Sequence, residues 1–293
     1  MSNPVMNPVI NPVINPKFGP LLDTRLRVVT WNLWGRGGPW EARLAGIAAT
    51  LRALAPDIVT LQEVWEETGG ASQAVVLAET LGFHQVFAGR YAIDDVAMGN
   101  AILSRWPVAG FTVRPLPAPP ERQELRNVVR ADVDGPRGRL HVFTTHLNWK
   151  FDQSDIRQEQ VRAVAEFVAE TPDTEAPPIL AGDFNAAPDS DEIRMLTGRT
   201  TIPVAGLAFQ DAWEMAGDGG PGCTWVNANP WARADLEPDR RIDYIFTGFP
   251  QRGGVGQLLH CRVVCNDEQD GVWPSDHFGV YAELRSEPLA PHA

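Results

Sequence analysis

Cysteine is scarce in this chain of 293 residues, which contains only Cys223, Cys261 and Cys265. An odd and sparse count argues against the disulfide framework of a small secreted domain. The spacing also lacks the paired pattern of a zinc module. We therefore expect three reduced cysteines in a cytoplasmic protein.

Long hydrophobic runs are missing as well. No segment approaches the roughly 18 apolar residues that a membrane-spanning helix needs. The N-terminus has no charge before Lys17, so it lacks the basic start of a secretory signal. Both absences favour a cytoplasmic location and the lack of a transmembrane segment.

Positive charge is in the minority, because 25 lysines and arginines face 37 aspartates and glutamates, for a formal net charge of −12. Proteins that bind duplex DNA through its phosphates regardless of sequence are usually basic. This class is disfavoured, although a local basic groove is compatible with an acidic total. A small phosphorylated substrate, or a cation held among carboxylates, fits the composition better.

Several catalytic motifs are absent. The sequence has no HExxH helix, no glycine-rich phosphate loop with lysine and no GxSxG nucleophile elbow. Ser275, Asp276 and His277 are the residue types of a nucleophilic triad, but adjacent side chains on a strand point to opposite faces and do not converge. What remains is metal-assisted attack of water on a phosphoryl group.

The N-terminal segment repeats Asn-Pro every four residues. Each proline removes a backbone donor and disfavours helix at the residue before it. We predict a disordered or extended tail over residues 1–22, one domain over 23–286 and a short C-terminal tail over 287–293. The hydrophobic content of 44% suits a sizeable core.

Short β-branched runs alternate with helical patterns along the predicted domain. Helices are expected at 40–54, at 72–82 with Gly82 as the C-terminal stop, and from about Ser154. Strands are expected at 26–32, 56–64, 99–104, 127–133, 139–147, 176–184, 240–248 and 278–284. Several neighbouring strands lack an intervening helix, so a purely parallel sheet is disfavoured. Two packed sheets with helices outside are the expected arrangement.

Polar side chains recur where these predicted strands meet loops. They are Asn32, Glu63, His146, Asp183, Asn185, Asp243, Asp276 and His277. Each alone is compatible with a cap or a satisfied core group, but together they indicate an active site on one rim. Oxygen ligands without a thiolate or a histidine pair suit a hard cation such as Mg²⁺ or Mn²⁺.

Seven segments, taken in order, resemble the endonuclease/exonuclease/phosphatase superfamily. They are TWNLW, LQEVW, GNAILSRWP, TTHLNW, GDFN, RIDYIF and SDHFGV. The resemblance covers residues 26 to about 285. It implies an α/β fold, a four-layer α/β/β/α sandwich in which two mixed β-sheets pack face to face. It also implies a deoxyribonuclease-like phosphoesterase that depends on a divalent metal, Mg²⁺ or Mn²⁺.

The resemblance assigns one group of residues to the metal and the water. Glu63 would be the principal metal ligand, with Asn32 as a ligand or the neighbour of one. Asp276 would be a candidate second ligand. Asp183 would orient or deprotonate the attacking water, and Asn185 would hydrogen-bond that water or a phosphate oxygen.

A second group is assigned to the phosphate. Asp243 would hold His277 in its useful tautomer and raise its basicity. His277 and His146 would contact the phosphate from two sides. Arg126 would bind phosphate. Asn100 would line the site, with the alternative that it is a strand-start amide.

These residues predict a hydrolase that cleaves a phosphoester bond with activated water, in the leading hypothesis a phosphodiester and in a nuclease-like manner. The alternative is a phosphatase or a sphingomyelinase-like phospholipase C that acts on a small molecule or a lipid. A non-catalytic binding relative is the third hypothesis. The expected partner is nucleic acid or a phosphorylated small molecule or lipid, bound by a monomer.

Ten tryptophans are the distinctive feature of the composition. Most are expected in the core, because tryptophan is highly buried on average. Two or three are expected at the rim of the site, where a ring can stack on a base or hold a lipid or choline group.

The acidic run AGDFNAAPDSDEI, residues 181–193, combines two predicted devices. Asp183 is the chemical residue. Asp189 is predicted to cap a following helix, and Glu192 to complete a capping box with it. Asp191 would add favourable charge at the start of that helix.

Overall fold

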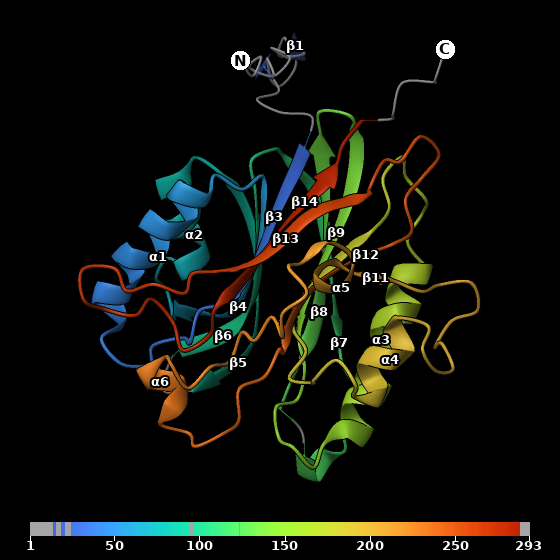
Figure 1. Cartoon of the computed structure of the whole chain (residues 1–293). Helices are drawn as coiled ribbons and strands as arrows, with labels where there is room; N and C mark the ends of the chain where they lie inside the picture. The colour runs from blue at the N-terminus through green and yellow to red at the C-terminus, as the bar shows by residue number, and fades with distance from the viewer. Residues whose placement is uncertain (1–13, 16–18, 21–24, 94–95, 123, 288–293) are drawn as a thin grey trace, which may run out of the picture.

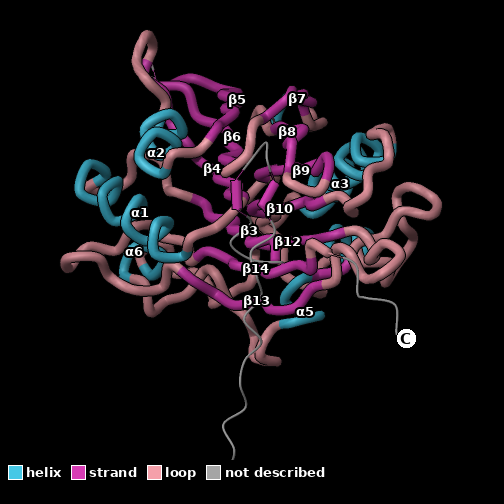
Figure 2. Tube along the Cα trace, turned by 90° about the horizontal axis from the view of Figure 1, so that it is seen from above, coloured by secondary structure: helices cyan, strands magenta, loops and turns pink. Residues whose placement is uncertain are grey.

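The computed structural model of the protein describes residues 14–15, 19–20, 25–93, 96–122 and 124–287. Two six-stranded sheets pack against each other, and helices cover their outer faces (Figure 1). The view from above places α1 and α2 on one side of the sheets and α3 on the other (Figure 2). The predicted four-layer α/β/β/α sandwich is confirmed.

The first sheet has the strand order β13–β14–β3–β4–β6–β5. These strands are Leu258–Val264, Gly279–Arg285, Arg25–Asn32, Ile58–Glu67, Val96–Ser104 and His84–Ile93. β3 and β4 are parallel and the other pairs are antiparallel. The helices α1 (Trp40–Leu54) and α2 (Gln73–Leu81) bury their apolar residues against the outer face of this sheet.

The second sheet has the strand order β11–β12–β10–β9–β8–β7. These strands are Gln210–Asp211, Asp243–Thr247, Ile179–Asp183, Gly138–His146, Asn127–Gly135 and Val108–Pro115. Only β9 and β10 are parallel among its described pairs. The helices α3 (Ser154–Ala169) and α4 (Asp191–Leu196) pack on its outer face.

Five short elements complete the described structure. The 3-10 turn η1 (Pro120–Arg122), α5 (Ala212–Ala216) and α6 (Pro230–Arg233) lie in connections. The strands β1 (Ile14–Asn15) and β2 (Gly19–Pro20) pair with each other, and the rest of the predicted Asn-Pro tail lies outside the described residues. No helix in the described part of the chain is long and apolar enough to cross a membrane.

Alternation along the strands decides which side chains enter the space between the sheets. On β3, Leu26 and Val28 join the cluster between the sheets, whereas Val29 and Trp31 join the cluster under α1 and α2. Side chains two residues apart share a face, so Asn32 continues the inner series of β3. The core between the sheets therefore leads directly into polar residues at the strand ends.

The predicted helices agree well with the observed ones. The helix predicted at 40–54 coincides with α1, and the helix predicted at 72–82 ends at Gly82, whose φ of 70° gives the left-handed conformation of a C-cap. β7 was not predicted, because Phe111 and Val113 on this edge strand are exposed and break the expected apolar pattern. β5 and β13 were also missed.

The predicted capping box after Asp183 is wrong. The N-cap of α4 is Ser190 rather than Asp189, and Asp189 is exposed. Glu192 is fully buried, where it accepts hydrogen bonds from Arg157 Nε at 2.5 Å and from Ser154 Oγ at 2.8 Å. Sequence spacing suggested a local cap, but a partner 35 residues away in the chain holds this carboxylate. Asp191 does lie in the first turn of α4, as expected.

We predict that Glu192→Ala lowers the free energy of unfolding by about 3–5 kcal/mol, because it leaves the buried guanidinium of Arg157 without its carboxylate. The matched control Asp189→Ala should stay within about 0.5 kcal/mol of the parent, since that side chain is exposed. Urea unfolding followed by circular dichroism measures both. Equal losses in the two variants would contradict the assignment.

Candidate active site

Three of the predicted residues form a single row across the second sheet. Asp183 pairs in register with His146 on β9 and with Asp243 on β12. Residues that are opposite in register project from the same face of a sheet. Each continues an inner apolar series, since Val142, Ala181 and Ile245 line the core between the sheets.

Gly182 fixes how closely the strands of this row approach. Its φ is 150°, and a Cβ there would lie 2.0 Å from the backbone oxygen of Thr145 on β9. No side chain larger than hydrogen fits at this point. The glycine before Asp183 therefore belongs to the strand packing that places the carboxylate.

The amide of Asn32 joins the two sheets. Its Nδ2 donates to Asp183 Oδ2 of the second sheet at 3.0 Å and to Glu63 Oε1 of the first sheet at 3.3 Å. Its Oδ1 accepts from the backbone nitrogen of Trp34 at 3.0 Å, which sets the orientation of the amide. Asn32 is 1% exposed, so these contacts are shielded from water.

The sequence had suggested that Glu63 lies at a strand end. In the structure it lies at an irregularity inside β4. The register of β4 against β6 shifts between Leu61 and Val64, and Glu63 has a φ of 53°. A non-glycine residue in the left-handed region is strained, and such strain concentrates at functional sites. The bulge turns the carboxylate toward Asn32.

The histidine predicted to act with Asp243 does contact it. His277 Nδ1 lies 2.9 Å from Asp243 Oδ2, while its Nε2 lies 3.8 Å from Asp183 Oδ2. His146 Nε2 approaches the same Asp183 oxygen at 3.4 Å. Asp183 therefore lies between two imidazoles, and Asp243 orients one of them.

The ionisation of this cluster reflects its burial. Burial raises the pKa of Asp183 to about 6, and the charge of Asp243 adds to the effect. Burial alone would lower the pKa of His277, but Asp243 and Asp183 raise it well above its ordinary value. Burial and the charge of Arg126 lower the pKa of His146 well below its ordinary value. The two histidines thus differ, because their surroundings favour the charged form of His277 and disfavour the charged form of His146.

Asp276 and Glu63 form the other acidic part of the site. Burial raises the pKa of Asp276 to about 7, and the charge of Glu63 also raises it. The hydroxyl of Ser275 lies 2.7 Å from the backbone oxygen of Asn32 and 3.1 Å from Asp276 Oδ1, so its single hydrogen is shared between these two acceptors. This network attaches the segment before β14 to the end of β3.

Asn185 lies two residues after the end of β10, and hydrogen bonds hold its conformation. Its backbone nitrogen donates to Asp183 Oδ1 at 2.9 Å, and its Nδ2 donates to the backbone oxygen of Leu147 at 3.2 Å. Its φ of 50° is left-handed. Asn185 therefore helps to orient Asp183 and joins it to the loop after β9.

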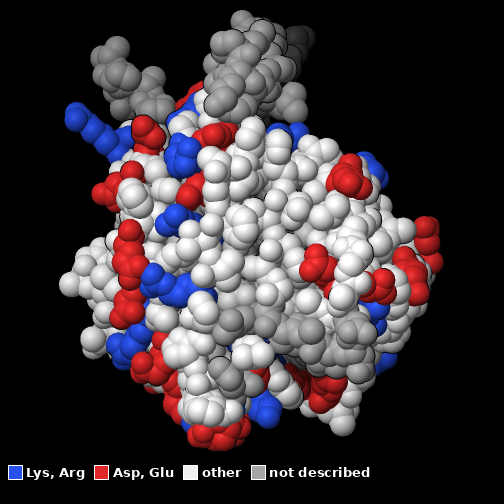
Figure 3. Space-filling view, turned by 180° about the vertical axis from the view of Figure 1, so that it is seen from behind, with Lys and Arg blue, Asp and Glu red and all other residues white. Residues whose placement is uncertain are grey.

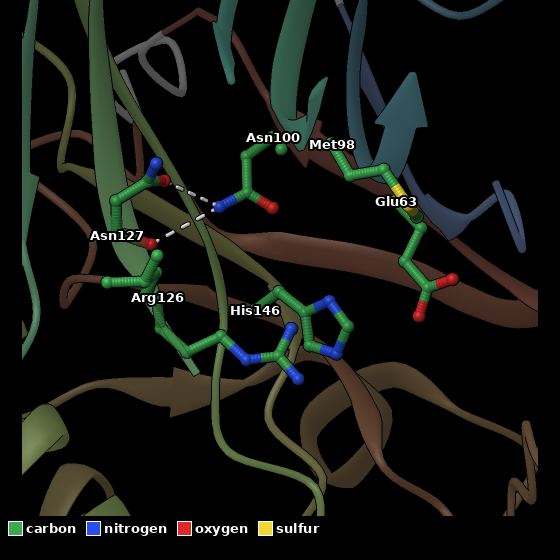
Figure 4. Close-up of a pocket in the computed structure, with 8 residues that line it drawn as sticks. Glu63, Met98, Asn100, Arg126, Asn127 and His146 are labelled. Carbon is green, nitrogen blue, oxygen red and sulfur yellow. Dashed lines mark hydrogen bonds between the residues drawn. The ribbon is translucent and has the colours of Figure 1, made fainter. Parts of the chain in front are cut away.

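The structure places Arg126 and Asn100 beside His146 in a pocket with Glu63. Glu63, Arg126 and His146 point toward one opening (Figure 4). Nε and Nη2 of Arg126 both donate to Glu124, at 3.1 and 2.8 Å. The pocket also contains Met98, Gly99, Leu125 and Asn127.

The side chain of Asn100, in the first sheet, is hydrogen-bonded to the second sheet. Its Nδ2 donates to the Oδ1 and the backbone oxygen of Asn127 at 2.8 and 3.2 Å. It lies within β6 rather than at its start, so the strand-start alternative is wrong. Asn100 lines the pocket while its amide joins β6 to β8.

Arg43 was missed by the sequence analysis. The side chain is 1% exposed and donates from all five N–H positions to backbone oxygens. The acceptors are Leu33, Trp34, Gly35, Gly37 and Pro274. Burial lowers its pKa to about 10, while Asp276 and Glu63 raise it. The signal was an arginine at the helical spacing of Ile47 and Leu51, on the face that α1 buries.

The expectation that most tryptophans are buried in the core is wrong, because only four of the ten are buried. Trp31, Trp65, Trp106 and Trp225 are buried, whereas Trp149 is 49% exposed. Trp225 contacts the ring of His277 edge-on, with ring centres 4.9 Å apart. Trp34 and Trp231 pack together on the α6 side, with ring centres 5.2 Å apart.

These positions agree with a comparison to known families. A sequence profile described as the Endonuclease/Exonuclease/phosphatase family matches residues 29–277. The chain belongs to this family. Endonucleases, exonucleases and phosphatases all hydrolyse phosphoester bonds, so the predicted reaction class is confirmed for this family member.

Individual relatives agree with the family. The chain is 27% identical to tyrosyl-DNA phosphodiesterase 2 of Danio rerio over 269 residues, which covers 90% of this chain and 68% of that protein. It is also 27% identical over 190 residues to a Drosophila melanogaster protein named as a neutral sphingomyelinase, covering 60% of this chain and 42% of that protein.

Solved structures of family members have the same fold. A family protein of Beutenbergia cavernae DSM 12333 superposes with a TM-score of 0.70 at 29% identity, over 89% of this chain and 71% of that one. Tyrosyl-DNA phosphodiesterase 2 of Danio rerio, solved with a single-strand DNA product, has a TM-score of 0.70 at 24% identity, over 89% of this chain and 99% of that one.

We predict that Arg43→Met destabilises this family member by at least about 3 kcal/mol, because it leaves several buried carbonyl oxygens without a donor. Arg43→Lys should recover only part of the loss, since an ammonium group has three donors and no planar fork. Thermal and urea unfolding measure the difference. A stability equal to the parent in Arg43→Met would contradict the structural role.

We also predict that Asn32→Ala weakens the affinity for a divalent metal by about 10–100-fold, the range found for groups that orient metal ligands. Binding of Mn²⁺ measured by calorimetry gives this change directly. Circular dichroism would show that the fold is kept. Unchanged metal affinity would mean that the amide bridge has no influence on Glu63.

Proposed function

We propose that this protein hydrolyses phosphodiester bonds with water as the nucleophile and Mg²⁺ or Mn²⁺ as the cofactor. The observation that supports this most strongly is that the half-buried Glu63 converges with the buried Asn32, Asp183, Asp243 and His277 at the junction of the two sheets. A set of carboxylates with two oriented imidazoles suits phosphoryl transfer, where positioning and charge stabilisation supply most of the catalysis.

The donor groups fit a hard divalent cation. Glu63 and Asp276 supply oxygen atoms, which Mg²⁺ and Mn²⁺ prefer, and burial together with the charge of Glu63 raises the pKa of Asp276, an effect that a bound cation would oppose. Asp243 Oδ1 is a buried oxygen without a hydrogen-bond partner among the described residues. When bound, the cation would act as a Lewis acid on the phosphoryl oxygens.

A second cluster also brings potential ligand atoms together. One ligand atom each from Asp183, Asp243 and His277 lies within 4.8 Å of the others. The Nδ1 of His277 already faces Asp243, and the carboxylates around the ring raise its pKa well above the ordinary value, which disfavours the neutral imidazole that a metal binds. We therefore assign the metal to Glu63 and Asp276, and the cluster around Asp183 to the water and the phosphate.

The protein groups would act on the substrate in distinct ways. Asp183, held by Asn32 and Asn185, would orient the attacking water or accept a proton from it. His277, oriented by Asp243, would donate a hydrogen bond to a phosphoryl oxygen from one side. His146 and Arg126 would contact the phosphate from the other side.

We propose a nucleic-acid strand as the substrate class. The 27% identical relative from Danio rerio is named for a phosphodiester attached to DNA and covers 90% of this chain. On the face shown in Figure 3, acidic and basic residues intermingle without a broad basic patch, so this face offers little to a long duplex. Recognition would then depend on groups close to the site.

A lipid phosphodiester is the second candidate. It is supported by the similarity to the protein named as a neutral sphingomyelinase. We further expect a monomer that works in the cytoplasm. Light scattering of the purified protein tests the oligomeric state.

The decisive experiment is a substrate panel in Mg²⁺ or Mn²⁺, with an EDTA control. Single-stranded and duplex DNA, abasic DNA, a tyrosyl-linked oligonucleotide, RNA, sphingomyelin and inositol phosphates belong in it. We expect hydrolysis of a nucleic-acid phosphodiester that EDTA abolishes. Hydrolysis of sphingomyelin alone would instead establish the second candidate.

We predict that Glu63→Gln and Asp183→Asn each lower kcat by roughly 100-fold or more while the fold is kept, as for the loss of a group that acts in the transition state. Steady-state kinetics on the best substrate and circular dichroism measure the two properties. Metal-dependent turnover that survives Glu63→Gln unchanged would refute the assigned metal ligand.

A further inference from the structure

Two aromatic side chains stand out from the surface next to the site. Trp149 is 49% exposed and Phe151 is 59% exposed, in the connection between β9 and α3. Lys150 lies between them, is exposed as well, and is the only lysine in the described part of the chain. We refer to Trp149, Lys150 and Phe151 as the aromatic tip.

The backbone below the aromatic tip is held firmly. Asn148 is fully buried, and its Oδ1 accepts from Gln160 Nε2 at 2.7 Å. Arg157 Nη1 donates to the backbone oxygens of Asn148 and Lys150 at 3.2 and 2.7 Å. The backbone nitrogen of Gln153 donates to the same Lys150 oxygen at 3.1 Å. The two rings are therefore presented by an ordered loop, which lowers the entropy lost on binding a ligand.

The aromatic tip is tied to the catalytic strands. The backbone N–H of Leu147 donates to the backbone oxygen of Asp183 at 3.0 Å, and the backbone oxygen of Leu147 accepts from Asn185 Nδ2 at 3.2 Å. Trp149 comes three residues after His146, so the two Cα atoms are at most about 11 Å apart. A stacked strand advances about 3.4 Å for each nucleotide, so this reach corresponds to about three nucleotides.

Arg240, in the connection between α6 and β12, places a cation beside the aromatic tip. Arg240 lies over the ring of Phe151, with its guanidinium carbon 4.4 Å from the ring centre. Its backbone pairs with Trp225, whose ring contacts His277. One of its nitrogens forms an ion pair with Glu237, and its Nε has no hydrogen-bond partner among the described residues.

Lys150 adds a second cation to the aromatic tip. Its Nζ lies 5.8 Å from the ring centre of Trp149. In the described part of the chain it has no carboxylate within ion-pair distance, whereas the neighbouring Arg122 is paired with Asp155 at 2.9 Å. Its charge is thus available to a ligand.

Building on the proposed phosphodiesterase function, we propose that the aromatic tip binds unpaired nucleotides of the strand whose phosphate is cleaved. Trp149 and Phe151 supply faces on which bases stack, while Lys150 and Arg240 face the backbone phosphates. Every base has a π-face, so this contact does not depend on sequence. It provides local binding in a protein whose net charge is −12.

A bilayer is a poorer occupant for the same residues. Loops that enter a membrane interface combine apolar residues with a surplus of basic ones. Here the exposed Asp152 follows Phe151 directly, and Asp155 occupies Arg122. Acidic groups so close to the rings oppose an anionic lipid surface.

Fluorescence anisotropy tests the proposal without turnover. The background is Asp183→Asn with Mg²⁺, and the probes are fluorescein-labelled single-stranded oligonucleotides of increasing length and a blunt duplex. We expect Trp149→Ala with Phe151→Ala to weaken binding of the single strands by about ten- to a hundredfold, the effect of losing a stacked base. Binding of the blunt duplex should change much less.

Phe249→Ala provides the matched control. This ring is 61% exposed, similar to Phe151, but it follows the opposite end of β12 from Asp243. It should leave oligonucleotide binding as it is. The double tip variant in the otherwise native protein should also keep its kcat on bis(p-nitrophenyl) phosphate, a diester too small to reach the tip.

Three results would overturn the proposal. They are unchanged binding of single strands, an equal loss on the small diester, and tip-dependent binding to sphingomyelin and phosphatidylcholine vesicles in place of oligonucleotides. Failure of the proposed function gives a different result, because the native protein would then cleave no phosphodiester at all. The anisotropy measurement still decides the tip in that case.

Discussion

One amide holds the site together across the two sheets. Asn32 belongs to the first sheet, yet it donates to Asp183 of the second and to Glu63 of its own. A buried amide that contacts two carboxylates at once fixes their separation, because each hydrogen bond has a narrow range of distance and angle. The packing of the sheets therefore sets the geometry of the site, and small movements between the sheets would be felt at both carboxylates.

The second constraint is electrostatic. Asp183, Asp243, Asp276 and Glu63 are gathered where water is largely excluded, and burial raises the pKa of Asp183 and Asp276. Arg43 supplies a nearby positive charge without covering any carboxylate, because backbone oxygens occupy all its donors. Arg43 consequently forms no ion pair with these carboxylates. The charge of Arg43 thus serves the packing of the loops, while the carboxylates of the candidate site keep their own partners.

Much of the site could be predicted from the sequence because its residues follow predicted strands and belong to motifs that resemble those of the endonuclease/exonuclease/phosphatase family. Two-residue alternation places Asn32, His146 and Asp183 on inner faces, and the motif order places them at one rim. Alternation carries no information about distant partners, so the buried pair of Glu192 and Arg157 resembled a local cap. The bulge at Glu63 was hidden for a similar reason, since the left-handed φ of 53° comes from pairing with β6. Arg43 was missed because burial of an arginine depends on carbonyl groups supplied by loops that fold around it.

Gly182 has a consequence for how the chain reaches this state. His146, Asp183 and Asp243 meet only when β9, β10 and β12 pair in one register. A slip of one residue in β10 would turn Asp183 to the opposite face and bring another residue to the point where β9 lies closest. Only glycine fits there, with a Cβ position 2.0 Å from the oxygen of Thr145. The lack of a side chain at Gly182 therefore favours the one alignment of β9 and β10 in which the polar side chains at the strand ends share a face.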